Sequence, residues 1–262
     1  MNGTPNQNIM ETPTLENPAD ILKDHPVVSR SQWIAARKAL LAEEKELTRR
    51  RDALNAKRRA LPWVKVDKNY VFEGPDGPVS LADLFDGRSQ LIVYHFMFGP
   101  GDEEGCPGCS FICDHVDAAR QHFEHGDVSF AAVARAPLAE FQSFKNRMGW
   151  KFPWVSSAGS DFNFDFHVSY TPEQIASGEV EYNYSTIKPW GEEAHGISVF
   201  HRNDAGEIFH TYSCYARGGE QALGTFMFMD LTPLGRNEES TMNWIRLHDR
   251  YDDGKKSCCG VD

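Results

Sequence analysis

The clearest pattern along the chain is a seven-residue spacing of apolar side chains near its N-terminus. Ser29 and Gln32 have the spacing of a capping box, which marks the start of a helix. Pro62 cannot continue a helix. The spacing predicts an amphipathic helix over residues 27–62, and we expect it to pack on the rest of the chain or to be exchanged between subunits, because an apolar stripe needs cover. That stripe consists of Trp33, Leu40, Leu47, Leu54 and Leu61.

From Tyr70 onward the pattern changes to alternating strands and helices. Residues 91–98 are almost entirely apolar, as expected for a central strand buried on both faces. The order strand, helix, strand, helix, hairpin, helix predicts a three-layer α/β sandwich with a mixed sheet, preceded by the N-terminal helical arm. The predicted elements are a strand pair over 70–85, a strand at 91–98, a helix at 107–125, a strand at 128–134, a helix after Pro137, a short strand at 152–157, two strands over 196–216 and a helix at 220–231.

Composition divides the chain into four parts. Residues 1–26 are polar, contain four prolines and lack periodicity, which predicts a disordered tail. The α/β domain is expected over 63–237, with the aromatic and polar stretch 161–194 as an insertion or long loop. Residues 238–262 form a C-terminal extension that ends in two adjacent cysteines, Cys258 and Cys259, which indicate exposed thiols.

Charge is unevenly distributed. The whole chain carries a formal charge of −11, which argues against a nucleic-acid partner. Ten basic and four acidic residues lie between Arg30 and Arg59, so this segment carries +6 and the remainder −17. Two interpretations remain: the basic helix is a solvated face, or it docks on its own acidic domain or on that of a sister subunit, which would make the protein a homo-oligomer.

The sequence predicts a cytoplasmic protein without a membrane segment. The longest apolar run, at residues 91–98, is far shorter than the roughly 20 residues of a membrane helix. The N-terminus has neither the basic region nor the apolar core of a secretory signal. In such a chain six cysteines do not indicate a disulfide framework. They are Cys106, Cys109, Cys113, Cys214, Cys258 and Cys259, and the first three fall within eight residues.

The cysteine cluster lies between the central strand and the following helix. Cys106 takes the position of an N-cap, and Pro107 that of the first helical residue. Backbone N–H groups at a helix start stabilise a thiolate, so Cys106 is the predicted nucleophile. Cys109, one turn into the helix, is expected to stay a thiol and to resolve the mixed disulfide formed at Cys106. A C-x-x-C at such a junction is typical of redox chemistry; a metal site and inert cysteines are the alternatives.

Several motifs make this chain resemble the bacterial family of the domain of unknown function numbered 899. The resemblance covers roughly residues 25–237. It implies a thioredoxin-like fold and a predicted dithiol–disulfide oxidoreductase activity, with Cys106 as the exposed nucleophile and Cys109 as the buried partner. The motifs are HPVVSRSQW, RALPWVKV, QLIVYHFMFGP, EEGCPGCSF, RMGWKFPWVSS and DLTPLGR.

Two features differ from the better-known thioredoxin-fold enzymes. Thioredoxins place a cis-proline opposite the dithiol, whereas the corresponding stretch here, EEAHGISVF, has His195 and Gly196. Peroxiredoxins place P-x-x-x-[TS]-x-x before the reactive cysteine, but the residue seven positions before Cys106 is Gly99. The sequence therefore does not predict a standard peroxiredoxin site.

Other residues near this junction are candidates for supporting roles, and most have more than one interpretation. Cys113 is a core side chain, a second resolving thiol or a metal ligand. Arg135 and Arg217 follow strands, where either could bind an anion or stabilise the Cys106 thiolate, or be structural. Glu103 and Glu104 are solvated loop charges or proton acceptors. His95, in the apolar strand, is expected to be a hydrogen-bonded core histidine.

The leading hypothesis is a thiol–disulfide oxidoreductase without a cofactor. Its substrate would be a disulfide-containing protein or a small oxidised thiol, reduced with electrons from a donor that the sequence does not specify. The alternative is a copper- or zinc-binding, metal-delivery protein, since copper-delivery proteins with the thioredoxin fold use a comparable cysteine pair and a distant histidine. A third hypothesis is a binding module without catalysis. The metal ligands would be Cys106, Cys109, Cys113 and His195.

Overall fold

The computed structural model describes residues 22–23, 25–238 and 240–251. Most of the expected N-terminal tail, together with Cys258 and Cys259, lies outside the described residues. The main feature is an eight-stranded sheet with the order β1-β10-β9-β4-β5-β6-β2-β3. Its strands are β1 (Val64–Lys65), β2 (Val71–Gly74), β3 (Gly77–Ser80), β4 (Gln90–His95), β5 (Val128–Ala134), β6 (Trp154–Ser156), β9 (Gly196–Arg202) and β10 (Ile208–Tyr215).

The centre of the sheet has the thioredoxin topology. β4 and β5 are parallel and are joined through helices, while β9 lies antiparallel to β4 and pairs with β10 as a hairpin. The order β10-β9-β4-β5 is that of the βαβ–ββα unit predicted from the sequence. The expected mixed sheet and thioredoxin-like fold are therefore confirmed.

Both faces of the sheet are buried, which gives three layers. On one face α3 (Pro107–Cys113), α4 (Val116–His125), α5 (Leu138–Met148) and α8 (Gly224–Met229) cover the strands. Tyr94 and Phe96 point into that core, while Leu91 and Val93 point into the core of the opposite face. This alternation explains why the strand is apolar at nearly every position.

Residues 161–194, expected to be an insertion or long loop, help to cover the second face. They contain α6 (Phe162–Asp165), α7 (Pro172–Ser177) and the hairpin of β7 (Val180–Tyr182) and β8 (Ser185–Ile187). Their side chains pack with the short 3-10 turn η1 (Asp83–Phe85) under the sheet. The buried side chains that this segment contributes are Phe162, Phe166, Val168, Tyr170, Val180 and Tyr182.

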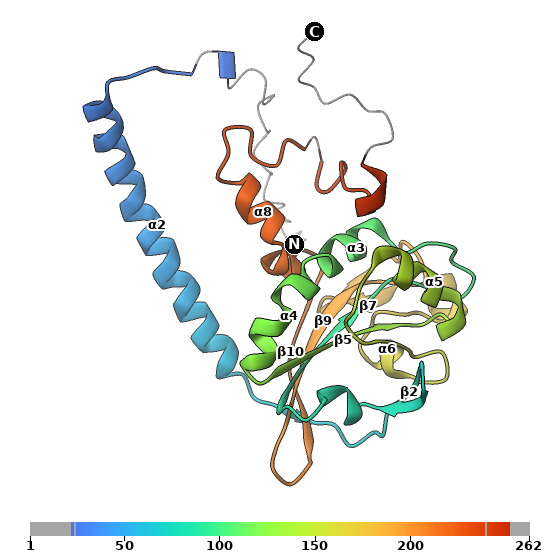
Figure 1. Ribbon diagram of the computed structural model, residues 1–262. Helices are drawn as coiled ribbons and strands as arrows, with labels where there is room; N and C mark the ends of the chain where they lie inside the picture. Colours follow the sequence, from blue (N-terminus) through green and yellow to red (C-terminus); the bar gives the residue numbers. More distant parts are fainter. Residues whose placement is uncertain (1–21, 24, 239, 252–262) are drawn as a thin grey trace, which may run out of the picture.

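The N-terminal helix α2 (Arg30–Arg59) stands away from the domain, as Figure 1 shows. The predicted capping box is present, because the Ser29 side chain accepts from the Gln32 backbone and the Gln32 side chain accepts from the Ser29 backbone. α2 has no buried residue. The expectation that it packs along its own domain is therefore wrong for this chain, and its apolar stripe is uncovered.

Two predicted helices are shorter than expected. The helix expected at 107–125 is broken at Asp114 and His115, whose side chains bond to distant residues: Asp114 accepts from Trp150 Nε1 at 2.8 Å, and His115 Nε2 lies 2.8 Å from Thr225 Oγ1. The helix expected at 220–231 consists of the 3-10 segment η2 (Ala216–Ala222) and α8.

Among the described residues no helix is long and apolar enough to cross a bilayer.

Candidate functional site

The loop before Cys106 is held by backbone contacts at its glycines. The Gly99 N–H donates to Asp102 Oδ2 at 2.7 Å, and the Gly101 N–H donates to Glu140 Oε2 at 2.7 Å. A side chain at Gly105 would come within 2.6 Å of the Phe144 ring and 2.8 Å of the Phe96 ring. Only a glycine there lets the chain pass over the aromatic core and deliver Cys106 to the surface.

Cys106 is the N-cap residue of α3, and Pro107 is its first residue, as predicted. The Cys106 carbonyl accepts from the Ser110 backbone N–H at 2.9 Å, which starts the helix. The Cys106 side chain is partly exposed, whereas Cys109 lies one turn further in and is 1% exposed. One sulfur therefore reaches solvent and the other does not.

The pKa values of the two thiols are shifted in opposite directions. Hydrogen bonding from the Cys109 thiol lowers the pKa of Cys106 to about 6; burial opposes this effect, and the backbone amides of Cys109 and Gly108 add to it. Burial raises the pKa of Cys109, and its hydrogen bond to Cys106 raises it further. For Cys106 the largest cause is hydrogen bonding from the neighbouring thiol rather than from the backbone amides at the start of the helix, whereas for Cys109 the largest cause is burial.

Cys106 lines a cleft with a volume of about 430 Å³. One wall belongs to residues 240–251, which the sequence placed in an undefined C-terminal extension. Ile245 and Leu247 of this segment are buried in the same core as Cys109. The residues around the cleft are Met97, Asp102, Glu104, Gly105, Cys106, Pro107, Glu193, Arg246, Leu247 and Arg250.

The charges in this cleft are mostly paired. Glu104 Oε1 accepts from Arg147 Nη1 at 2.6 Å and forms a second ion pair with Arg250. Arg246 and Asp102 are the exceptions among the described residues that line the cleft. Arg246 Nη1 donates to the backbone carbonyls of Asn243 and Ile245, Asp102 Oδ2 accepts from the Gly99 N–H, and neither side chain forms an ion pair within the described ranges. The cleft thus contains one unpaired charge of each sign.

Comparison with known sequences identifies the family. The family model described as "Bacterial protein of unknown function (DUF899)" matches residues 22–251. The chain belongs to this family. No curated protein shows significant similarity to the sequence.

Solved structures similar to this DUF899 chain include peroxidoxin BcpB from Mycobacterium tuberculosis, at 13% identity and a TM-score of 0.41, covering 63% of this chain and 95% of that one. Xanthomonas campestris peroxiredoxin Q has 15% identity and a TM-score of 0.42, covering 64% and 96%. Xylella fastidiosa PrxQ has 14% identity and a TM-score of 0.40, covering 63% and 94%. At such low values the fold assignment depends on the strand order described above.

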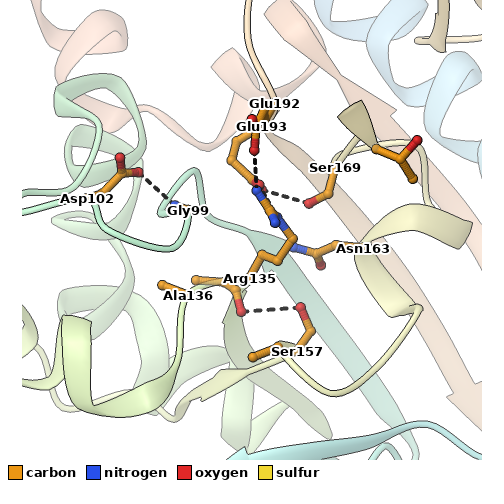
Figure 2. A network of polar contacts seen from close by, with 12 residues as sticks. Gly99, Asp102, Arg135, Ala136, Ser157, Asn163, Ser169, Glu192 and Glu193 are labelled. Atoms are coloured by element: carbon orange, nitrogen blue, oxygen red, sulfur yellow. Dashed lines mark hydrogen bonds and ion pairs between the residues drawn. The ribbon is translucent and has the colours of Figure 1, made fainter. Parts of the chain in front are cut away.

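Arg135 of this DUF899 chain belongs to a polar network next to the cleft, shown in Figure 2. Its Nε pairs with Glu193, and its Nη2 lies 2.9 Å from Glu192 Oε2. Ser169 Oγ donates to the other Glu193 oxygen at 2.7 Å. Burial raises the pKa of Glu193, and the hydrogen bonds from Ser169 and Arg135 oppose that rise. Arg135 therefore compensates a buried carboxylate that lines the cleft.

The other predicted supporting residues, Cys113, His195 and Gly196, are buried or partly buried. Cys113 is fully buried, and burial raises its pKa. His195 is partly buried, and its ring lies 6.5 Å from that of Tyr94. Gly196 begins β9, where a Cβ atom would come within 2.6 Å of Tyr215. Gly196 is thus required by packing against Tyr215.

The structure supports a structural or surface role for three further candidates, Arg217, Glu103 and His95. Arg217 is exposed and pairs with Glu220 at 2.6 Å. Glu103 is exposed. His95 is fully buried, with Nδ1 3.1 Å from Asn163 Oδ1 and Nε2 2.9 Å from Ser198 Oγ, so it is a hydrogen-bonded core histidine as expected.

The metal-binding alternative finds no preformed site in the part of the chain that the structure describes. No three side chains of His, Cys, Asp or Glu there are grouped so that they could hold a metal ion. The set of three cysteines and His195 therefore stays a prediction.

Sequence reasoning missed several residues around the dithiol. Arg246 and Arg250 come from the C-terminal segment 240–251, and Glu193 comes from the segment 161–194. Nothing in their local sequence indicates that they lie near Cys106. Tyr94 could have been noticed, because a tyrosine in an otherwise buried strand needs a partner for its hydroxyl. That hydroxyl interacts with the buried Cys109.

Proposed function

We propose that this chain is a thiol–disulfide oxidoreductase in which Cys106 is the nucleophile and Cys109 the resolving thiol. The observation that supports this most directly is the unequal state of the two sulfurs. Cys106 is partly exposed in a cleft and has a pKa of about 6, so it is a thiolate at neutral pH. Cys109 is buried, and its pKa is raised, so it keeps its proton.

The exchange has two steps. The Cys106 thiolate attacks one sulfur of a substrate disulfide, R–S–S–R′; a bond forms between Cys106 and R–S, and R′–S⁻ leaves and takes a proton from water. Cys109 then loses its proton to solvent and attacks the Cys106 sulfur. The Cys106–Cys109 disulfide forms, and R–S⁻ leaves and is protonated. The dithiol is oxidised, and the substrate disulfide is reduced to two thiols.

A dithiol donor completes the cycle by reducing the Cys106–Cys109 disulfide through the same steps in reverse. The cleft of about 430 Å³ can hold a small oxidised thiol or the disulfide loop of a protein.

Three variants test the proposal, with dithiothreitol as the donor and either insulin or a small aromatic disulfide as the substrate. Cys106→Ser should lose activity by at least a hundredfold. Cys109→Ser should accumulate one substrate thiol per chain, bound to Cys106 and detectable by mass spectrometry. Cys214→Ser, which removes a buried cysteine away from the C-x-x-C, should keep activity. Full activity in Cys106→Ser would refute the proposal.

The metal-delivery alternative is tested on the same preparation, purified without a chelator. Elemental analysis of the full chain should find well under one equivalent of copper or zinc. A stoichiometric metal that is lost in both Cys106→Ser and Cys109→Ser would favour the alternative and would count against dithiol exchange as the main activity.

A further inference from the structure

Tyr94 buries a hydroxyl in the core that also contains Cys109. The residue lies on β4, is 1% exposed, and packs in the same core as Cys109. Its ring is held by an edge contact with Phe96, whose centroid lies 6.1 Å away. Among the described residues the hydroxyl has no hydrogen-bond partner of ordinary geometry. A buried hydroxyl without a partner is costly, so its presence in this core calls for a reason.

The Tyr94 hydroxyl interacts with Cys109, which is buried in the same core. Burial and the neighbouring Cys106 raise the pKa of Cys109, while interactions with the Tyr94 hydroxyl and the Met97 backbone amide lower it. Both donors therefore favour the ionised form of a thiol that is otherwise kept neutral. A thiol is a weak acceptor, whereas a thiolate is a strong one.

We propose that the Tyr94 hydroxyl and the Met97 backbone N–H form a two-donor site that stabilises the Cys109 thiolate during disulfide exchange. This inference rests on the proposed function. It assigns Tyr94 as a positioning residue that acts through Cys109. The hydroxyl lacks an acceptor in the resting dithiol and gains one only when Cys109 ionises. A donor that binds the thiolate but not the thiol lowers the energy of the reacting form of Cys109 and therefore accelerates the exchange step.

The site acts at the same atom in both directions of the cycle. In resolution, Cys109 loses its proton to solvent and attacks Cys106, and the bond between Cys106 and the substrate sulfur breaks. In regeneration, the thiolate of a dithiol donor attacks Cys106, the Cys106–Cys109 bond breaks, and Cys109 leaves as a thiolate. Each step passes through negative charge on the Cys109 sulfur, the charge that both donors stabilise.

A two-phase reaction measures the effect. The probe is 5,5′-dithiobis(2-nitrobenzoate), used with the full chain carrying Cys258→Ser and Cys259→Ser so that the tail thiols do not contribute. The first equivalent of released chromophore reports attack by Cys106, and the second reports resolution by Cys109. Tyr94→Phe keeps the ring and removes only the hydroxyl. Tyr170→Phe is the matched control, because Tyr170 is also buried and its hydroxyl donates to the His167 carbonyl.

The second phase of Tyr94→Phe should be slower by about 10- to 100-fold, the loss expected for one hydrogen bond to a charged group. Its first phase should stay within twofold, and its second phase should need a higher pH to reach half its maximum. Tyr170→Phe should change neither phase. An unchanged second phase in a folded Tyr94→Phe protein would overturn this inference while leaving the proposed function in place. A wild-type protein without a fast first phase would instead overturn the proposed function.

A second substitution keeps the test decisive if Tyr94→Phe does not fold. Tyrosine at position 94 is replaced by 3-fluorotyrosine, whose hydroxyl is a stronger donor in a ring of nearly the same size. The second phase should then be at least twofold faster than in the wild type. A rate that does not rise contradicts the role of the hydroxyl.

Discussion

Arg250 forms an ion pair with Glu104, 146 residues earlier in the chain. Glu104 lies two residues before Cys106, so this contact ties the C-terminal segment to the loop that carries the nucleophile. Arg147 of α5 binds the same Glu104 oxygen and also Asp249, at 2.8 Å. The wall of the cleft is therefore held by a network of charges, in addition to the burial of Leu247.

Removing Glu104 should loosen that wall. In Glu104→Gln both arginines lose their shared carboxylate, and the protein should lose about 0.5–1 kcal/mol of unfolding free energy, because these side chains are partly exposed to solvent. Cys106 should react with iodoacetamide at pH 7 two- to fivefold faster as the cleft opens. Glu103→Gln is the control, since Glu103 is exposed and no ion pair with it is seen within the described residues. Equal rates in the two variants would contradict this role of Glu104.

The reactivity of Cys106 should follow its low pKa. Because the thiolate is the reactive form, alkylation should reach half its maximum near pH 6 and fall at more acidic pH. In Cys109→Ala, which removes the thiol donor, the midpoint should rise clearly. Cys214→Ser should leave the midpoint unchanged. A wild-type midpoint near 8.5, as in a free cysteine, would remove the basis of the proposed function.

Protonation of His95 should destabilise the fold in mild acid. Burial lowers its pKa from 6.5 to about 4. Between these two values the unfolded chain binds a proton that the folded chain does not, so stability is retained above pH 6.5 and falls as the pH drops towards 4, by roughly 3 kcal/mol. Urea denaturation at pH 7.0, 5.5 and 4.5 measures this loss.

The matched variants isolate the contribution of His95. His95→Gln should be less stable at pH 7, because Asn163 and Ser198 lose their partner, but its stability should fall less between pH 7.0 and 4.5 than that of the wild type. His122→Gln, at an exposed position of α4, should behave as the wild type does. An identical acid dependence in the wild type and His95→Gln would show that other groups cause the loss.

The sequence predicts the parts of this molecule that local patterns determine. The capping box at Ser29, the apolar run that forms β4 and the N-cap position of Cys106 each follow from a few neighbouring residues, and each is present in the structure. The strand order follows from the succession of elements, because a βαβ unit and a hairpin can be assembled in few ways.

Contacts between distant segments could not be predicted in the same way. The segment 161–194 lacks periodicity because its aromatic side chains are buried by tertiary packing, as with Phe162 against the ring of Tyr70. The wall formed by Arg246 and Arg250 depends on where the chain returns after α8. The acidity of Cys106 was predicted from the helix start, but the larger effect comes from the orientation of the Cys109 thiol, which a spacing of three residues does not specify.

The uncovered helix α2 leads to the last prediction. A helix held only at its end gains no stability from packing, although tertiary packing provides most of the stability of helices in proteins. Leu40 and Leu47 are 52% and 68% exposed. The segment carries +6, whereas the rest of the chain carries −17. We propose that α2 packs on the acidic domain of a second copy of this chain, which provides both an apolar surface and the opposite charge.

Light scattering after size-exclusion chromatography should therefore find a dimer of the full chain. Leu40→Ser combined with Leu47→Ser removes apolar contacts but no charge and should give a monomer, with an activity per dithiol close to that of the wild type, because α2 does not line the cleft of its own chain. Glu43→Ser combined with Asp52→Ser makes the helix more basic and should leave the dimer intact. High salt should weaken the dimer, since part of the attraction is electrostatic. A wild-type monomer at micromolar concentration and low salt would mean that the apolar stripe of α2 is covered by something other than a second copy.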